Sequence, residues 1–557
     1  MKDKNTLKWL FGAVKKQFGA VFALIVLNSI SSALGVLFAL KFRAVIDTAA
    51  QGNRNGLIKS IAFVLLIVGF QIAIRVFVQS ISTVSAAKSE MAFKSRLFDN
   101  ILKKDYARIT SYHSGELMTR LTSDVSIVSD GLITLLPTVF AMITRLCFAA
   151  AALIALDRGF ALVFLAVGVL VLVVGSLFRR IMKSLHMRVQ ESDGRLRSFL
   201  QESIGGLLMI KVFGIENEIS DTAMQYQRAN YKAKLKRRTV NIAANTGLNL
   251  AFQLGYVFAF SYGAFKLIGG AAGFTVGTIT AIIQLVNQIQ TPFAAMSGIL
   301  PQYYGILASA ERLIEIENAD DEQGENEKSI DPKTAYHDLV SLNFENISFG
   351  YDRDIVLNNA SLVIEKGDFA VISGISGIGK STLIKLLLGV ITPKSGKIYL
   401  KFGTSVRKAD KSTRPLFSYV PQGNLLLSGT IRDAICITKK SATDAEINEA
   451  LRISCADKFL AEFPLGLETV IGEKGFGLSE GQVQRLAIAR AILSDKPIIL
   501  LDEATSALDE LTEHNVLSNI RAMKDKTCII ISHKRAAYNI CNKEIKIDDK
   551  KIYTKDI

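Results

Sequence analysis

Cysteine is scarce in this sequence, with five residues among 557. They are Cys147, Cys436, Cys455, Cys528 and Cys541, and they show no metal-ligand spacing. Four of them lie in the C-terminal part of the chain, which we expect in the cytosol, where thiols stay reduced. We therefore expect free thiols and no metal site built from cysteine.

Proline is also rare, with nine residues, and two long polar segments contain none. These segments, 82–130 and 179–247, are rich in Ala, Leu, Glu, Lys and Arg. Such a composition favours long helices. We expect the apolar helices beside them to continue into the cytosol as helical extensions.

Acidic residues are outnumbered, since 51 Asp and Glu face 66 Lys and Arg, and the formal net charge is +15. A charge of this size can indicate a nucleic-acid-binding protein. Here, however, basic residues gather beside apolar runs, as in 179–188 and 232–238. That arrangement is typical of the cytoplasmic face of a membrane protein, so we expect a lipid bilayer and no nucleic acid as partner.

Long apolar runs crowd the first part of the chain, and a bilayer span takes about 20 apolar residues. We expect six spans, at 19–42, 61–81, 131–156, 160–178, 248–268 and 276–300. The shorter gaps between them, predicted as outer turns, are 43–60, 157–159 and 269–275. The first run is too long for a signal peptide, so a retained membrane helix is expected. Before it, Trp9 and Phe11 among lysines suggest an amphipathic helix along the interface.

The composition changes after the sixth run. Residues 318–332 are acidic and polar and end in proline, a composition that cannot bury a core. We therefore expect a transmembrane domain at 1–317 and a linker at 318–338. From 339 to 557, short β-rich runs alternate with helical stretches, which predicts an α/β nucleotide-binding domain.

The segment GISGIGKST at 374–382 fits the phosphate-loop pattern G-x-x-x-x-G-K-[ST], between an apolar strand-like run and a helix-like run. Its backbone amides would surround phosphate groups at a helix N-terminus. Lys380 would reach the β- and γ-phosphates, and the Ser381 hydroxyl would bind Mg²⁺. The residues of this loop assigned to ATP are Gly374, Ser376, Gly377, Gly379, Lys380, Ser381 and Thr382.

A second motif, IILLDE at 498–503, has the pattern of a buried strand that ends in two carboxylates. Asp502 is placed to hold the Mg²⁺ shell, and Glu503 to orient or deprotonate an attacking water. An acidic pair at a strand end is often a mere turn. Together with a phosphate loop, it predicts a site that hydrolyses ATP with Mg²⁺.

The sequence LSEGQ at 478–482 resembles the signature of ABC ATPases, whose usual form is LSGGQ. The runs QRLAIARAIL at 484–493 and LLDEATSALD at 500–509 match the same family. So do Gln422, His533 and an aromatic residue, Tyr351, before the phosphate loop. The resemblance covers 339–557 with the motifs in family order, and it implies that two chains share each ATP site.

The resemblance also implies roles for single residues. Tyr351 would stack on adenine, Gln422 would sense Mg²⁺ and the γ-phosphate, and His533 would clamp that phosphate. Ser479 and Gly481 would contact ATP held by the opposite subunit, Gln482 belongs to the same ATP-binding signature, and Asp509 would lie at the dimer interface. The implied catalytic set is Glu503, His533 and Gln422, and the Mg²⁺ set is Ser381, Gln422 and, through water, Asp502.

Glu480 departs from the family pattern, which has glycine at this position. A carboxylate beside a triphosphate would be unfavourable if it pointed inward, so we expect it to point away. Since Glu503 and His533 are both present, the sequence favours a homodimer with two working sites. A heterodimer stays open.

Six spans, two long extensions and a C-terminal ATPase domain look like the exporter class of ABC proteins. This predicts an α-helical polytopic membrane domain fused to an α/β P-loop ABC ATPase domain. In that family, short coupling helices dock on the ATPase domains, and 106–112 and 211–216 are the matching stretches. Either stretch could instead be ordinary amphipathic surface.

Polar residues within the apolar runs are costly unless they line a cavity or pair with neighbours. Several recur at spacings that share one helix face or stand alone inside a run: Gln71, Arg75, Arg145, Asn249, Gln253, Gln284 and Gln288. One hypothesis is a hydrated, mildly cationic cavity for a polar or acidic substrate, such as a peptide. The other is hydrogen bonding between helices, with arginines that reach the interface.

The function implied is ATP-driven export of a peptide or amphipathic small molecule across the cytoplasmic membrane by alternating access. A lipid flippase and an ATP-gated membrane regulator that does not pump are the alternatives. The intact Glu503 and His533 argue against a pure gate. The six spans exclude a soluble ABC factor, and importers of this superfamily usually keep the two domains on separate chains.

Overall fold

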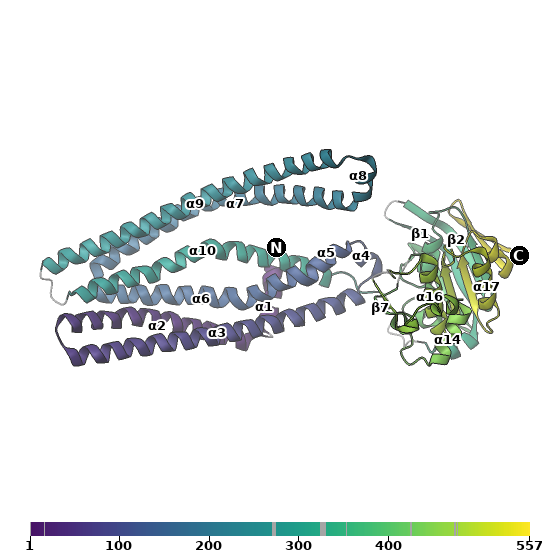
Figure 1. Ribbon diagram of the computed structural model, residues 1–557, viewed down its shortest axis with the longest axis horizontal. Coiled ribbons are helices and arrows are strands. Elements are labelled where there is room, and N and C mark those ends of the chain that lie inside the picture. Colours follow the sequence, from purple (N-terminus) through teal and green to yellow (C-terminus); the bar gives the residue numbers. More distant parts are fainter. Residues whose placement is uncertain are drawn as a thin grey trace. The chain divides into compact units, whose positions relative to one another are not determined.

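The structure is a computed structural model that describes residues 2–15, 17–269, 274–322, 330–351, 354–423, 426–472, 475 and 477–557. The chain divides into two units. One comprises Met1–Asn100 and Gly115–Asn318, and the other comprises Ile101–Ser114 and Ala319–Ile557. The first unit is helical, and the second is built on β-sheets (Figure 1).

Long helices make up the first unit: α1 (Lys2–Lys15), α2 (Phe18–Ala50), α3 (Arg54–Lys103), α6 (Val125–Leu156), α7 (Arg158–Gly205), α9 (Glu216–Ile268) and α10 (Val276–Glu317). Shorter helical segments join them: α5 (Ser114–Thr119), the π-helix η1 (Arg120–Asp124) and α8 (Leu207–Phe213). All six predicted spans lie within long helices. Within the described residues, three stretches are long and apolar enough to cross a membrane: Phe18–Ala50, Arg54–Lys103 and Ser114–Leu156.

The outer turns are shorter than predicted where the structure describes them. Only residues 51–53 separate α2 from α3, because helix continues through most of the polar stretch 43–60. Polar composition misled the prediction, since the ion pair between Arg43 and Asp47 at 3.3 Å supports a helix at i,i+4 spacing. Between α6 and α7 only Asp157 remains, and its carboxylate accepts from the Phe160 amide at 2.8 Å as a helix cap. The predicted turn at 269–275 lies partly outside the described residues.

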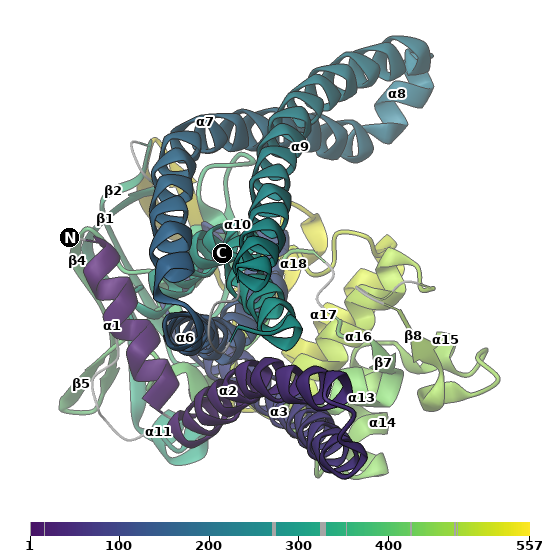
Figure 2. The ribbon, with the colours of Figure 1, turned by 90° about the vertical axis from the view of Figure 1, so that its left-hand side faces the viewer.

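Helices α2, α6 and α10 pack on one another, whereas α7 and α9 run side by side as a hairpin closed by α8 (Figures 1 and 2). Buried apolar residues such as Leu153, Ile282 and Leu285 form the core of this unit. Large apolar side chains on α3, including Phe70 and Phe77, are more than half exposed. An apolar outer surface of this kind suits lipid contact.

Trp9 of α1 donates a hydrogen bond from Nε1 to Glu317 Oε2 at 2.8 Å, so its indole faces the end of α10. Phe11 on the same helix is 65% exposed. The N-terminal segment is therefore helical as predicted. Of its two aromatic residues, Trp9 contacts another helix and Phe11 is exposed. Its contact with a membrane interface stays a prediction.

The second unit contains two main sheets. A four-stranded antiparallel sheet has the order β2 (Asp354–Glu365), β1 (Leu339–Tyr351), β4 (Ser395–Phe402) and β5 (Ser405–Lys408). A six-stranded sheet has the order β12 (Lys551–Asp556), β11 (Lys543–Asp548), β3 (Phe369–Ser373), β10 (Thr527–Ile531), β9 (Ile498–Asp502) and β6 (Phe417–Val420). All its strands are parallel except the edge strand β12. The short strands β7 (Gly429–Thr430) and β8 (Val470–Ile471) pair separately.

Helices cover these sheets: α11 (Pro332–Asp338), α12 (Lys380–Leu387), α13 (Ile431–Cys436), α14 (Asp444–Ile453), α15 (Asp457–Leu460), α16 (Glu480–Leu493), α17 (Glu510–Arg521) and α18 (Arg535–Ile540). Two apolar clusters form the core. One joins the six-stranded sheet to α13, α14, α16 and α17, and the other fills the space between the two sheets. The alternation of strands and helices confirms the predicted α/β class.

The predicted linker at 318–338 is partly structured. Its last seven residues form α11, which Asp331 caps by accepting from the Thr334 amide at 3.0 Å. Earlier in the segment, the Asp105 amide donates to Asp320 O at 3.0 Å, and the Glu322 amide donates to Lys103 O at 2.9 Å. Polar composition alone does not reveal capping or backbone pairing, and the remaining residues 323–329 lie outside the described part.

Candidate functional site

Four neighbouring parallel strands, in the order β3, β10, β9 and β6, end at one edge of the six-stranded sheet. The phosphate loop follows β3, His533 follows β10, Asp502 ends β9, and Gln422 follows β6. The three inner strands are buried along their whole length, which matches their continuous apolar runs. Four motifs far apart in the sequence therefore meet at one place.

The phosphate loop depends on glycine for its shape. Gly374, Gly377 and Gly379 have φ of +145°, +81° and +108°, a region that residues with a Cβ rarely occupy. A Cβ on Gly379 would also overlap Val356 Cγ1. The loop leads into α12, at the positive end of the helix dipole, where phosphate groups bind.

Lys380 is the buried cation of this loop, with 6% of its surface exposed. Its Nζ donates to Gly374 O at 2.8 Å and to Ile375 O at 3.2 Å, and it lies 2.8 Å from His533 Nε2. Burial lowers the pKa of Lys380, and the nearby carboxylates of Glu503 and Asp502 oppose that shift. Two of its direct partners are backbone carbonyls, which the ammonium can exchange for phosphate oxygens.

Asp502 is 1% exposed and accepts two hydrogen bonds. Ser381 Oγ donates to its Oδ1 at 3.0 Å, and the Tyr419 hydroxyl donates to its Oδ2 at 3.1 Å. Burial raises the pKa of Asp502, and burial together with the Asp502 charge raises the pKa of Tyr419. A hydroxyl beside a carboxylate offers the oxygen ligands that Mg²⁺ prefers, and the described residues hold no cluster of three His, Cys, Asp or Glu that would suggest another metal.

Glu503 has a left-handed backbone, with φ of +52°. Such a conformation costs a residue with a Cβ about 1–2 kcal/mol, so it is expected where function requires it. The Glu503 amide donates to Ile531 O at 3.1 Å, and its Oε2 accepts from Gln422 Nε2 at 2.7 Å. Gln422 therefore orients the carboxylate that the sequence assigns to the attacking water.

The signature LSEGQ starts α16. Ser479 caps this helix, because its Oγ accepts from the Gln482 amide at 3.3 Å while its own amide donates to Gln482 Oε1 at 2.9 Å. Gly481 lies close to the next loop, where an added Cβ would be 3.0 Å from Ala507 O. Glu480 is exposed on the first turn. No hydrogen bond between described residues joins this helix start to the phosphate loop.

Three further residues, to which the sequence motifs assign no role, also support the site. Tyr419 binds Asp502, as described above. Gln484 holds the loop after Glu503, because its Nε2 donates to Ser506 Oγ at 2.9 Å and its Oε1 accepts from the Ala507 amide at 3.0 Å. Lys534 donates to Thr505 O at 3.0 Å and Leu508 O at 2.9 Å, and pairs with the buried Glu513 at 3.3 Å. Only proximity in the fold identifies them.

The remaining predicted ATP-site residues lie at helix starts or strand ends. Asp509 caps α17 by accepting from the Thr512 amide at 2.9 Å, and it is exposed. Tyr351 ends β1, is 47% exposed, and places its hydroxyl 3.4 Å from Thr382 Oγ1. The aromatic side chain therefore lies beside the phosphate-loop helix and is partly exposed, and stacking on adenine stays a prediction.

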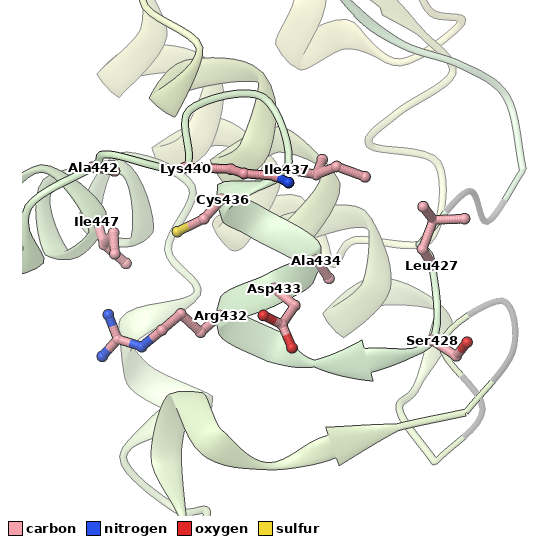
Figure 3. A pocket seen from close by; sticks show the side chains of 10 residues that line it. All are labelled: Leu427, Ser428, Arg432, Asp433, Ala434, Cys436, Ile437, Lys440, Ala442 and Ile447. Atoms are coloured by element: carbon pink, nitrogen blue, oxygen red, sulfur yellow. The ribbon is translucent and has the colours of Figure 1, made fainter.

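A groove of about 520 Å³ opens along α13 (Figure 3). Its lining residues are Leu427, Ser428, Arg432, Asp433, Ala434, Cys436, Ile437, Lys440, Ala442 and Ile447. Arg432 is held by Asp444 at 2.7 Å and by Glu468 at 2.8 Å, whereas Leu427 and Ile437 stay exposed and apolar. An apolar groove with a charged edge is suited to an amphipathic helix.

The helical unit contains a separate polar cavity of about 430 Å³. Its lining residues are Ser31, Gly35, Val68, Gln71, Ile72, Arg75, Arg145, Asn287, Gln288 and Thr291. The structure thus brings together four of the predicted residues, Gln71, Arg75, Arg145 and Gln288. The other three do not line it: Asn249 and Gln253 are exposed on α9, and Gln284 is half-buried elsewhere on α10. Ser31, Asn287 and Thr291 were missed.

Comparison with known proteins gives two family matches. The pattern of the ABC transporter transmembrane region matches residues 21–293, and the pattern described as ABC transporter matches residues 357–506. The chain belongs to the ABC transporter family. Its transmembrane region and its ATP-hydrolysing domain share one polypeptide, so it is a membrane protein, and the predicted family and enzyme class are confirmed.

Relatives of this transporter include a putative multidrug export ATP-binding/permease protein of Bacillus subtilis, 26% identical and covering 96% of this chain and 93% of the relative. An ATP-dependent lipid A-core flippase of Syntrophus aciditrophicus is 29% identical over 79% of this chain and 73% of the relative. A solved bacterial Atm1-family ABC exporter with ATP bound has a TM-score of 0.80 and 21% identity, with 98% of this chain and 95% of that chain covered. That structure confirms the exporter fold.

Proposed function

We propose that this transporter is a homodimer that exports its substrate across the cytoplasmic membrane by alternating access, with the ABC domain in the cytosol. ATP and Mg²⁺ would bind at two sites, each shared between the ABC domains of both chains. The observation that carries the proposal is the separation of the site within one chain. The phosphate loop, Asp502, Glu503 and His533 gather at one sheet edge, while Ser479 and Gly481 start a different helix without a hydrogen bond to that loop among the described residues.

Each residue at the sheet edge has a distinct task. Lys380 and His533, 2.8 Å apart, would hold the γ-phosphate. Ser381 and Asp502 would hold Mg²⁺, whose charge offsets that of the phosphates. Glu503, oriented by Gln422, would position and deprotonate the attacking water. Ser479 of a second chain would complete the site, so that ATP binding favours the closed dimer and hydrolysis releases it.

Two short helices would transmit this closure to the membrane helices. They are α4 (Tyr106–Thr110), which lies in the predicted stretch 106–112 and which Asp105 caps through the Arg108 amide at 3.0 Å, and α8. Of the predicted stretch 211–216, α8 contains only 211–213, because Gly214, with φ of +64°, ends the helix. On α8, Leu208 and Val212 are more than 70% exposed, so the helix presents an apolar surface that needs a partner. The groove along α13 is an apolar surface of fitting kind, and its first lining residue, Leu427, comes five residues after Gln422 in the chain. Docking of such a helix there would link nucleotide sensing to the cavity.

The substrate is not specified by the family. The relatives carry names of different activities, a multidrug exporter and a lipid A-core flippase among them. A peptide or an amphipathic small molecule is our first candidate. A lipid flippase is the second, favoured by the exposed apolar surface of α3 and by the name of the Syntrophus relative.

The test is Glu503→Gln in proteoliposomes. Hydrolysis should fall by about 100-fold or more, because a general base of this kind contributes that much. ATP binding should remain, and ATP with Mg²⁺ should accumulate a closed dimer that mass photometry or crosslinking detects. Glu345→Gln, at an exposed position on β1, is the matched control and should behave as wild type. Brisk turnover by Glu503→Gln, or a chain that stays monomeric with ATP, would contradict the proposal.

A further inference from the structure

The cavity in the helical unit carries positive charge that its own lining does not balance. Arg75 comes from α3 and Arg145 from α6. The other polar lining residues are neutral: Ser31, Gln71, Asn287, Gln288 and Thr291. No carboxylate lines the cavity, and within the described residues no ion pair involves either arginine.

The sequence around the cavity explains this imbalance. Acidic residues are absent from every membrane-helix segment near it, namely 18–46, 54–89, 131–156, 158–190 and 222–310. A second copy of the chain would bring the same acid-free segments. A protein counter-ion for Arg75 and Arg145 is therefore missing from this level of the membrane domain, even in a homodimer.

Neutral hydrogen-bonding groups surround the two arginines in a defined arrangement. Gly35 makes room for Gln288, since a Cβ at Gly35 would lie 3.1 Å from Gln288 Nε2. The Tyr256 hydroxyl of α9 donates to Asn287 and, at 3.1 Å, to Gln290. Gln288 and Asn287 are thereby positioned by neighbouring helices.

One part of the cavity is apolar. Ile72 and Val68 lie one and two turns before Arg75 on α3, and both line the same space. Ile72 is 60% exposed, so its side chain is available to a ligand. The cavity thus combines a cationic, hydrogen-bonding part with an aliphatic part, which is the complement of an amphiphile.

Charge inside a membrane domain is costly, and it is usually found where an ion or substrate passes. The planar guanidinium group matches carboxylate and phosphate groups, to which it donates two parallel hydrogen bonds. An ammonium or quaternary-amine cargo would instead be repelled by both arginines. The sign of the uncompensated charge therefore selects the sign of the substrate.

We propose that this cavity binds the anionic head of an amphiphilic substrate, a carboxylate or a phosphate, with Arg75 and Arg145 as its ligands. Gln71 and Gln288 would hydrogen-bond the head, and Val68 and Ile72 would contact the apolar part. This inference rests on the proposed export function, because it treats the cavity as the substrate site. It adds the class of substrate: anionic amphiphiles, and neither cations nor neutral amphiphiles.

The test compares heads on one alkyl chain. Full-length transporter in phosphatidylcholine nanodiscs is titrated with dodecyl phosphate, dodecanoate and dodecyltrimethylammonium, with calorimetric binding and ATPase stimulation as readouts. The two anions should bind the wild type about tenfold or more tightly than the cation, since a charge-assisted hydrogen bond contributes at least that much. Equal binding of all three would overturn the inference without any variant.

Variants assign the effect to the two arginines. Arg75→Gln and Arg145→Gln should each weaken dodecyl phosphate binding by about tenfold or more. Arg75→Lys and Arg145→Lys keep the charge and should retain the preference for anions. Arg54→Gln, exposed at the first turn of α3, is the control and should stay within about twofold of the wild type. Unchanged binding in both Gln variants would refute the assignment.

Two further arms separate the sources of the anionic group. Triglutamate tests a soluble acidic peptide, and nanodiscs with added phosphatidylglycerol test a bilayer lipid. Stimulation that Arg145→Gln removes in either arm supports the inference and identifies the source of the anionic group. Absence of stimulation in both arms leaves single-chain anionic amphiphiles as the substrate class, and equal binding of the dodecyl probes alone rejects the inference. Failure of the export proposal looks different, because the wild type in proteoliposomes would then show no ATP-driven transport of any probe, whereas binding of the probes and its dependence on Arg75 and Arg145 would remain.

Discussion

Replacing Gly379 with alanine should disable nucleotide binding through two separable effects. At φ of +108°, a residue with a Cβ is strained by about 1–2 kcal/mol. The new Cβ would also overlap Val356 Cγ1, and forced overlap in a packed region costs about 1–3 kcal/mol. Together these give about 2–5 kcal/mol, which the loop would avoid by leaving the conformation that surrounds phosphate.

The assay is equilibrium binding of a fluorescent ATP analogue to the full chain in detergent or nanodiscs. Gly379→Ala should weaken binding by about 30-fold or more, the equivalent of about 2 kcal/mol. Gly367→Ala is the matched control, since Gly367 also has positive φ, +85°, but no atom lies within 4 Å of its added Cβ. It sits in the turn between β2 and β3, away from the loop, and should leave ATP affinity unchanged.

A second-site change isolates the overlap. Val356→Ala alone should alter ATP affinity little, and in combination with Gly379→Ala it should recover the part of the loss that comes from overlap. The strain at positive φ would remain, so recovery should be incomplete. Wild-type affinity in Gly379→Ala, or no recovery in the double variant, would show that the loop binds nucleotide in a different conformation from the one described.

Three further predictions follow from buried ionisable groups. Since burial raises the pKa of Asp502, protonation should compete with Mg²⁺ earlier than at an exposed aspartate, so the Mg²⁺ requirement of the ATPase should rise as pH falls from about 7 toward about 5. Burial raises the pKa of Cys541 to about 12, so mass spectrometry should find it unmodified by maleimide at neutral pH until the protein is unfolded. Lys534→Met leaves Glu513 without its cation and should lower the free energy of unfolding by about 2 kcal/mol, since Lys534 is partly exposed. The melting temperature should fall by several degrees, whereas Lys524→Met should leave it unchanged.

The gathering of the candidate ATP-site residues was largely predictable because these residues are read from local patterns. A phosphate loop needs its glycines in one short segment, and Asp502 and Glu503 end one apolar strand. Parallel strand order then brings these segments together, which the sequence does not state but the family order implies. Tyr419, Gln484 and Lys534 escaped prediction because their contacts join segments 21 or more residues apart, as between Lys534 and Leu508 at 26.

The membrane cavity was only half predictable, for a geometric reason. Helical spacing shows that Gln71 and Arg75 share one face, and likewise Asn249 and Gln253. It does not show which neighbouring helix each face meets. Gln288 meets α2 at Gly35, whereas Gln284, one turn earlier on α10, does not line the cavity. Contacts between helices determine which of these residues line the cavity, and the periodicity of a single helix does not reveal those contacts.

Arg75 and Arg145 sit on different helices, in a unit that contains none of the ATP-binding motifs. A one-residue change on α3 or α6 would alter the charge of the cavity by one per chain, and by two in a homodimer, while the hydrolytic machinery stays as it is. A change of substrate class therefore requires only one or two substitutions in the present sequence. Laboratory evolution toward a cationic drug should yield its first successful variants at these two positions, well before any change in the ABC domain.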